Sequence, residues 1–211
     1  MSGATNPFTL AEWRRMMTME YAAVRADVAD LESTAMRFRE TRDRLFREHP
    51  ESPLAAERRR DWRGVDWYAY APAWRLMGIV EPVAKPQTFE IPLEADGIVR
   101  CTRAGQVRFA VGRRQVRLAV YWLEGYGGGL WLPFTDATSG ADTYGGGRYL
   151  YDTIKGADLG AGAREMVLDF NYAYHPSCVY DPRWSCPLSP PENRLPFAVP
   201  AGERLPPGER R

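Results

Sequence analysis

The chain has 211 residues, of which 45% are hydrophobic and 26% are charged, as is ordinary for one globular domain with a buried core. It carries 28 Lys and Arg residues against 27 Asp and Glu residues, a net charge of +1. This balance argues against nucleic-acid binding, which usually needs a basic surplus. No apolar run approaches the roughly 18 residues of a transmembrane helix, so no membrane association is expected.

The N-terminal stretch MSGATNPFTLAEW lacks a basic region followed by an apolar one, so no signal peptide is expected. The three cysteines are Cys101, Cys178 and Cys186. An odd number without a signal peptide favours reduced thiols and a cytoplasmic protein. Cys178 and Cys186 lie in one proline-rich segment and would be able to pair in an exported protein, which the sequence leaves open. There is no CxxC motif, and neither a metal nor a cofactor is predicted.

Residues 8–62 are predicted to be helical. Apolar residues recur there at steps of three and four and form one stripe: Leu10, Trp13, Met17, Tyr21, Val24, Val28 and Leu31. Thr9 and Glu12 have the spacing of a capping box. A second helix is expected over residues 38–48, ending at His49-Pro50, and Ser52-Pro53 is expected to open a short third helix.

Residues 65–170 are predicted to form β-structure. The β-rich segments cover residues 74–80, 88–93, 98–103, 106–111, 115–124, 130–134 and 165–170. Turn signals such as Ala104-Gly105 separate them, and the intervals are too short for crossover helices, so neighbouring strands should be antiparallel. The fold class is therefore mainly β (α+β), an antiparallel β-barrel or curved β-sandwich with N-terminal helices.

The remaining part of the chain is rich in proline. Proline cannot donate to a β-ladder, so residues 171–204 are expected to wrap the barrel as an ordered loop. The expected anchors are apolar: Tyr180, Trp184, Leu188, Leu195, Phe197 and Val199. Residues 205–211 are expected to be disordered, and residues 1–211 to form a single domain.

Several motifs of the chain carry a family resemblance. RDRLFREHPESPL, residues 62–75, TDATSGADTYGGGRYL, DFNYAYHPSCVY and CPLSPPENRLPFAVPAGE follow one another in this order. The chain thereby resembles domain-of-unknown-function family 1684 of bacterial and archaeal proteins over nearly its whole length. The resemblance implies no particular activity. One departure is that the family has asparagine where this chain has His175.

Residues 131–150 and 169–180 concentrate polar, aromatic and glycine residues and are expected to meet at one end of the barrel. The candidate catalytic residues are acids and bases: His175, Asp136, Asp142, Tyr144 and Asp169. The candidate substrate-binding residues are Arg148, Asn171 and Trp122. A buried Arg148 needs a carboxylate partner or an anionic ligand, so a purely structural ion pair stays open.

Other interpretations of the same residues also remain. Asp136 has the setting of an Asx-turn, and a histidine before proline, like His175, is often a hydrogen-bonded loop residue. The spacing of His175 and Cys178 allows a metal ligand pair or a nucleophilic pair. With only two histidines in the chain, a full set of metal ligands is not expected.

Three functions fit these patterns. The first is a cofactor-independent enzyme, of cyclase, isomerase or hydrolase type, acting on a small organic acid or natural-product intermediate in a β-barrel pocket. The second is a barrel that binds a small-molecule ligand, anionic or not, at the same place without catalysis. The third is a structural or interaction protein whose polar motifs only attach the proline-rich segment. The sequence does not predict the oligomeric state.

Overall fold

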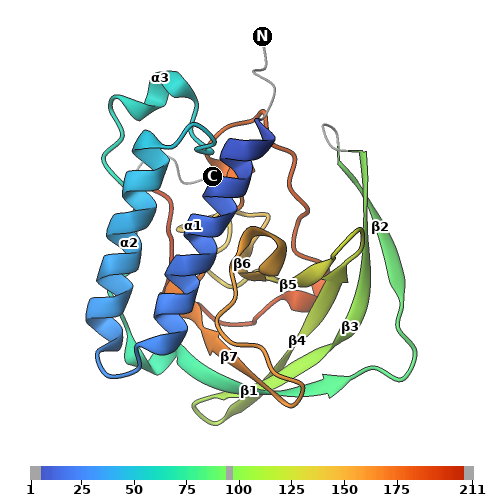
Figure 1. Cartoon of the computed structure of the whole chain (residues 1–211). Coiled ribbons are helices and arrows are strands. Elements are labelled where there is room, and N and C mark those ends of the chain that lie inside the picture. The colour runs from blue at the N-terminus through green and yellow to red at the C-terminus, as the bar shows by residue number, and fades with distance from the viewer. Residues whose placement is uncertain (1–5, 94–96, 207–211) are drawn as a thin grey trace.

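A curled antiparallel sheet with two long helices against it forms the fold, as the computed structural model shows (Figure 1). The structure describes residues 6–93 and 97–206. The predicted class, α+β with a curved antiparallel sheet and N-terminal helices, is confirmed, and the sheet is a half-barrel. No helix in these ranges has the length and apolar character to cross a membrane.

Helix α1 (Pro7–Ala26) begins three residues before the position that the sequence predicts for its start. Asn6 is the N-cap, its side chain accepts the N–H of Phe8, and Pro7 occupies the first helical position. Proline is tolerated there because its missing N–H would have no helical partner. Because the helix is capped at Asn6, the predicted capping box at Thr9 is wrong. The buried stripe comprises Met17, Tyr21 and Val24. Val28, expected in this stripe, is 64% exposed because the helix ends before it.

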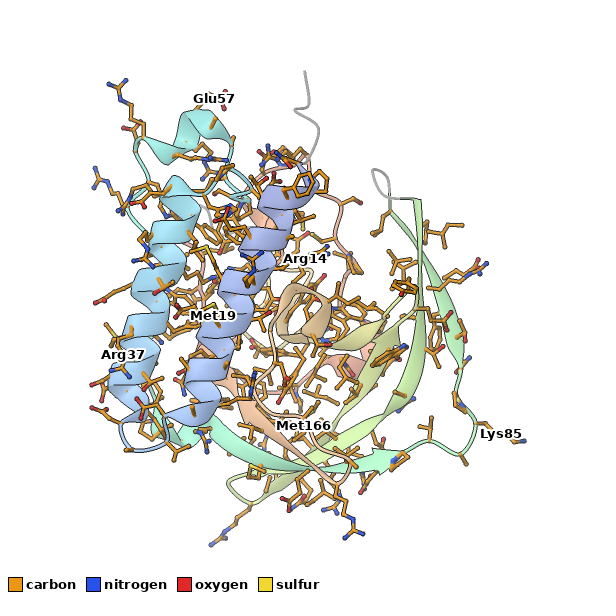
Figure 2. All side chains as sticks on the ribbon, viewed as in Figure 1. Arg14, Met19, Arg37, Glu57, Lys85 and Met166 are labelled. Carbon is orange, nitrogen blue, oxygen red and sulfur yellow. The ribbon has the colours of Figure 1, made fainter. Side chains whose placement is uncertain are left out.

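Helix α2 (Leu31–Glu48) is longer than the predicted span of 38–48. The Asp30 side chain caps its N-terminus by accepting the N–H of Ser33. The helix ends at His49, before Pro50, as predicted. Helix α3 (Ala56–Arg59) is a single turn that starts three residues after Pro53. Side chains of α1 and α2 fill the space between the helices and the sheet, whereas Arg37 points outward (Figure 2).

The sheet has seven strands, and the pairings between them are antiparallel. Their order is β6-β5-β4-β3-β1-β7, with β2 also paired to β3. The bounds are β1 Arg75–Pro82, β2 Thr88–Leu93, β3 Gly97–Val111, β4 Arg114–Leu123, β5 Gly129–Phe134, β6 Arg148–Asp152 and β7 Glu165–Asp169. Short 3-10 turns cover Pro72–Trp74, Thr153–Lys155, Phe170–Tyr172, Ser177–Val179 and Pro191–Asn193.

Strand β3 joins two segments that the sequence predicts as separate strands. The turn expected at Ala104-Gly105 is instead a β-bulge, where the register against β4 shifts between Arg103 and Gly105. A bulge bends a strand and increases its twist. One edge of β3 pairs with β2 before the bulge and with β1 after it. The bulge therefore lies where the sheet curls.

Strand β6 is absent from the sequence prediction because all five of its residues are buried and show no alternation. Strand β6 lies at one end of the strand order and contacts β7, at the other end, and the residues that follow β7. The Tyr151 hydroxyl donates to the Val167 carbonyl in β7 at 2.6 Å, and Tyr149 exchanges two backbone hydrogen bonds with Tyr174. The core inside the curl holds Val107, Phe109, Leu118, Phe134 and Phe170, among others.

The segment after β7 is irregular but anchored, as predicted for residues 171–204. Tyr180, Leu195 and Val199 are buried, and Trp184 and Phe197 are partly buried. Leu188 is 55% exposed and is not an anchor. Within the range predicted to be disordered, Leu205 is buried and donates its N–H to the Asp142 carbonyl. Residues 207–211 lie outside the described residues.

Candidate functional site

Arg148, at the start of β6, is almost completely buried, with 1% of its surface exposed. Its Nη2 lies 2.6 Å from Oδ2 of Asp136 and also donates to the Val199 carbonyl. Its Nη1 donates to the carbonyls of Ala201 and Glu203. Burial lowers the pKa of Arg148 and Asp136 opposes this shift, but guanidinium remains charged in proteins. Arg148 therefore clamps the C-terminal segment, with its Nη groups already engaged by protein.

Asp136 follows the end of β5 and makes the Asx-turn that the sequence left open as an interpretation. Its Oδ1 accepts from both the N–H and the hydroxyl of Thr138, while Oδ2 pairs with Arg148. Both oxygens thus have partners, and the side chain is buried. This arrangement favours a structural role, because both carboxylate oxygens already accept hydrogen bonds from protein groups.

Glu203 is the centre of a second buried cluster. It is fully buried, and its Oε1 lies 2.5 Å from Nε of Arg42 in α2. Its Oε2 accepts the N–H of His175 at 2.6 Å and the hydroxyl of Tyr180 at 2.7 Å. The carboxylate therefore links α2 to the irregular segment at two places.

His175 lies beside this carboxylate. Its Nδ1 is 3.6 Å from Oε2 of Glu203, and its Nε2 accepts the N–H of Tyr144 at 3.3 Å. Burial, together with the charges of Arg148 and Arg42, holds the pKa of His175 well below 6.5. The imidazole is thus neutral at pH 7, with its proton on Nδ1 because Nε2 acts as the acceptor.

Three of the predicted site residues, Asp169, Asn171 and Trp122, lie in two other places. Asp169 and Asn171 form a local pair, in which Oδ1 of Asp169 accepts from the backbone and side-chain N–H groups of Asn171. Asn171 in turn exchanges hydrogen bonds with the backbone of Ala71, and Asp169 lies 3.6 Å from Arg75. These contacts hold the backbone that leads into β1 and the first residue of that strand. Trp122, in β4, is 42% exposed.

Asp142 and Tyr144 enter the cluster around Arg148 and His175 through their backbones. The Asp142 carbonyl accepts from Leu205, and the Tyr144 N–H donates to His175. The structure therefore brings Asp136, Asp142, Tyr144, Arg148 and His175 together around the C-terminal segment.

A small chamber opens beside the Glu203 cluster, with a volume of about 50 Å³. Its polar lining includes Arg42, Tyr174, His175 and Tyr180, and α1 contributes Trp13, Met17 and Tyr21. An outer chamber of about 170 Å³ shares Trp13, Pro53, Lys155 and Ser177 with it. We call the two neighbouring chambers the α1 cleft.

Two side chains of the α1 cleft have capacity for a ligand. Arg42 lies between two rings, with its guanidinium carbon 4.7 Å from the Phe46 centroid and 5.2 Å from the Tyr174 centroid. Arg42 is hydrogen-bonded to Glu203 and to the Tyr180 side chain, which leaves other N–H donors of its five. The Tyr174 hydroxyl is buried and has no hydrogen-bond partner among the described residues. Burial raises the pKa of Tyr174 well above 10, so the phenol stays protonated and can donate.

Lys155 stands where the two chambers meet. Its side chain is about half exposed, and its Nζ lies 3.4 Å from Oδ2 of Asp152, the last residue of β6. Asp152 is the main cause of the raised pKa of Lys155. The Lys155 ammonium therefore lies at this junction as an ion pair with Asp152.

Sequence reasoning missed Arg42, Tyr174, Lys155 and Glu203. For Arg42 a signal exists, because it lies four residues from both Phe38 and Phe46 and so shares their buried face. Glu203 carries no such signal, since its partners come from segments distant in sequence.

A separate apolar cleft of about 500 Å³ lies between β2 and the irregular segment. Residues 89–93 and 186–192 form its walls, with Cys101 and Tyr121 contributing to the lining. The Tyr121 hydroxyl donates to Glu192 at 2.6 Å. In the part of the chain that the structure describes, no group of three or more His, Cys, Asp or Glu side chains is placed to hold a metal ion.

Comparisons with known proteins give a family and a fold. A family model described as protein of unknown function (DUF1684) matches residues 60–204. A solution NMR structure of an uncharacterized protein from gene locus rrnAC0354 of Haloarcula marismortui is similar, with 32% identity and a TM-score of 0.59. The similarity covers 85% of this chain and 97% of that chain. No curated protein matches the chain.

Proposed function

The chain belongs to the DUF1684 family, and we propose that it binds a small organic acid in the α1 cleft, with the carboxylate held between Arg42 and Tyr174. The observation that carries this proposal is the Tyr174 hydroxyl, buried without a partner beside a chamber that Arg42 also lines. A buried polar group without a hydrogen bond costs about 1–3 kcal/mol, so a ligand that accepts from it would recover this free energy.

The sizes and charges of the two chambers support the same ligand class. The inner chamber has the volume of a few water molecules or one carboxylate group. The outer chamber is larger, and its apolar walls, Leu10, Trp13 and Pro53, suit an apolar or aromatic body. Arg14 and Glu51 also line it, one of each charge. Lys155 at the junction adds a second cation. A small acid fits this arrangement, with its carboxylate in the inner chamber and a short apolar body in the outer one.

Arg148, the residue that the sequence favours for anion binding, is not part of this proposal. Its Nη groups already bind Asp136 and three carbonyls, so an entering anion would have to displace them. Arg42 takes its place because its donors are less fully used. The free thiols support placing this function in a reducing compartment such as the cytoplasm.

Catalysis without a cofactor is the second candidate function, with His175 as the acid or base. The observation in its favour is that His175 lines the inner chamber and is neutral, the state that a general base requires. Its Nε2 already accepts the backbone N–H of Tyr144, so this hydrogen bond would have to break before Nε2 could accept a proton from a substrate. His175→Asn should then abolish turnover of small carboxylic acids while leaving their binding intact.

The binding proposal is tested with benzoate and its neutral analogue benzamide. We expect isothermal titration to detect benzoate and not benzamide, because only the carboxylate complements Arg42 and Lys155. Tyr174→Phe should weaken benzoate binding about 5-fold, the effect of one ordinary hydrogen bond. Equal binding of benzoate and benzamide would refute the proposal.

Tyr172→Phe is the matched control for Tyr174→Phe. The Tyr172 hydroxyl is also buried without a partner among the described residues, but Tyr172 lines neither chamber. Its removal should leave benzoate binding unchanged. Equal loss in both variants would show that the effect at Tyr174 is indirect.

A further inference from the structure

Cys178 and Cys186 form a thiol pair at the edge of the α1 cleft. Both are free and partly exposed, and the Cys178 thiol is hydrogen-bonded to the Cys186 sulfur. Cys178 belongs to the 3-10 turn Ser177–Val179, and Cys186 lies further along, in the irregular segment. The pairing of these thiols has no part in the binding of an acid by Arg42 and Tyr174.

The surroundings of Cys186 stabilise a thiolate. The thiol of Cys178 lowers the pKa of Cys186 most, burial opposes this shift, and the Lys155 ammonium and the N–H groups of Cys178 and Ser177 lower it further. The same contact raises the pKa of Cys178. Tyr144 and Tyr149 also face the pair, and burial raises the pKa of both. The charged residues that share a cleft lining with Cys186 are Arg14 and Glu51 in the outer chamber and Glu90 and Glu192 in the apolar cleft. The contacts with Cys178, Lys155 and the two N–H groups favour the thiolate at Cys186, the cysteine that lines the outer chamber with Lys155.

Small molecules have two routes to Cys186. The residue lines the outer chamber of the α1 cleft together with Lys155, and it also lines the 500 Å³ apolar cleft on the other side of the segment. A reactive cysteine needs both an electropositive setting and access, and Cys186 has both. Cys101, by contrast, is 1% exposed.

We propose that Cys186 is a nucleophile and Cys178 its resolving thiol, and that together they reduce small disulfides by thiol–disulfide exchange. The Cys186 thiolate attacks one sulfur of the small disulfide, a mixed disulfide forms, and the departing thiolate takes the proton of Cys178. The Cys178 thiolate then attacks the sulfur of Cys186 and releases the second half of the substrate as a thiolate, which takes a proton from water. Two electrons pass from the two cysteines to the substrate, which becomes two thiols.

The test uses the reduced full-length protein and 2-hydroxyethyl disulfide, with intact-protein mass spectrometry over time. The wild type should lose the mass of two hydrogen atoms and release two equivalents of 2-mercaptoethanol. Cys178→Ser should accumulate the mixed disulfide on Cys186, because no resolving thiol remains. Cys186→Ser should abolish fast oxidation, and Cys101→Ser should react like the wild type.

Lys155→Met separates a thiolate site from two merely neighbouring cysteines. Without the ammonium, the pH at which the first step reaches half its maximal rate should rise, because the thiolate loses its nearest cation. The proposal fails if Cys178→Ser gains no adduct, if Cys186→Ser is oxidised as fast as the wild type, or if Lys155→Met keeps the wild-type pH profile. These outcomes do not depend on benzoate binding, so each proposal can fail alone.

Discussion

At the scale of single residues, Arg148 and Arg42 show how buried charges hold this fold together. Each is paired with a carboxylate from another part of the chain, Asp136 and Glu203 respectively. The sequence indicates that a buried Arg148 requires a carboxylate partner or an anionic ligand, with Asp136, Asp142 and Asp169 as candidate partners, and does not single out Asp136. The second pair is not predictable from the sequence, since 161 residues separate Arg42 from Glu203.

Arg148→Met should lower the free energy of unfolding by about 3–5 kcal/mol, because it leaves the buried Asp136 carboxylate without a counter-charge. The control is Arg37→Met. Arg37 pairs with Asp27 at the same N–O distance of 2.6 Å, but both side chains are exposed, so the expected loss is much smaller than for Arg148→Met. Urea denaturation of both variants checks this, and equal losses would contradict the structural role of Arg148.

His175 should make the protein less stable in mild acid. Because its folded pKa lies well below 6.5, the unfolded chain binds the proton more readily in the interval below 6.5. The free energy of unfolding should therefore fall as the pH falls from about 6.5 towards the folded pKa of His175. His175→Asn should flatten this part of the profile, as measured by urea denaturation between these limits. An unchanged slope in the variant would show that other groups cause the loss.

At the scale of elements, the periodicity of two predicted the strands better than the turn signals did. The strands β4 and β5 lie within a residue of their predicted bounds. Ala104-Gly105 was interpreted as a turn because a glycine after a small residue is typical of one. Gly105 instead permits close approach, since a Cβ at this position would lie 2.9 Å from the Glu81 carbonyl oxygen of β1. Such a contact between strands is not visible in one sequence.

Gly105→Ala should therefore destabilise the sheet at its bulge by about 1–3 kcal/mol, the usual cost of overpacking. Gly145→Ala is a suitable control because its added Cβ would meet only ordinary contacts, the closest at 3.7 Å. Thermal denaturation of the two variants compares them. If Gly105→Ala melts at the temperature of the wild type, the close approach does not constrain β1 against β3.

At the scale of the whole molecule, the proline-rich segment is an integral part of the fold, because it supplies the partners of buried charged groups. The backbone carbonyls of Val199, Ala201 and Glu203 accept hydrogen bonds from Arg148, and the Glu203 carboxylate accepts one from Arg42. The sequence predicted the wrapping from its proline content and its aromatic anchors. It did not predict which polar groups the segment satisfies, because those contacts depend on the final packing of three distant parts of the chain.

A chain that ends after residue 198 should consequently lose cooperative unfolding, because the buried Arg42 and Arg148 lose partners at once. Near-ultraviolet circular dichroism and thermal denaturation would show this as a loss of tertiary signal and of a sharp transition. A melting temperature equal to that of the full chain would mean that the segment after residue 198 contributes little to the fold.

The central claim is that a small carboxylate binds in the α1 cleft. The most direct measurement is a crystal structure of the protein grown with benzoate. The account predicts benzoate in this cleft, with a carboxylate oxygen within hydrogen-bond distance of the Tyr174 hydroxyl and the other facing Arg42. Benzoate in the apolar cleft between β2 and residues 186–192, or an α1 cleft that holds only water at saturating benzoate, would contradict it.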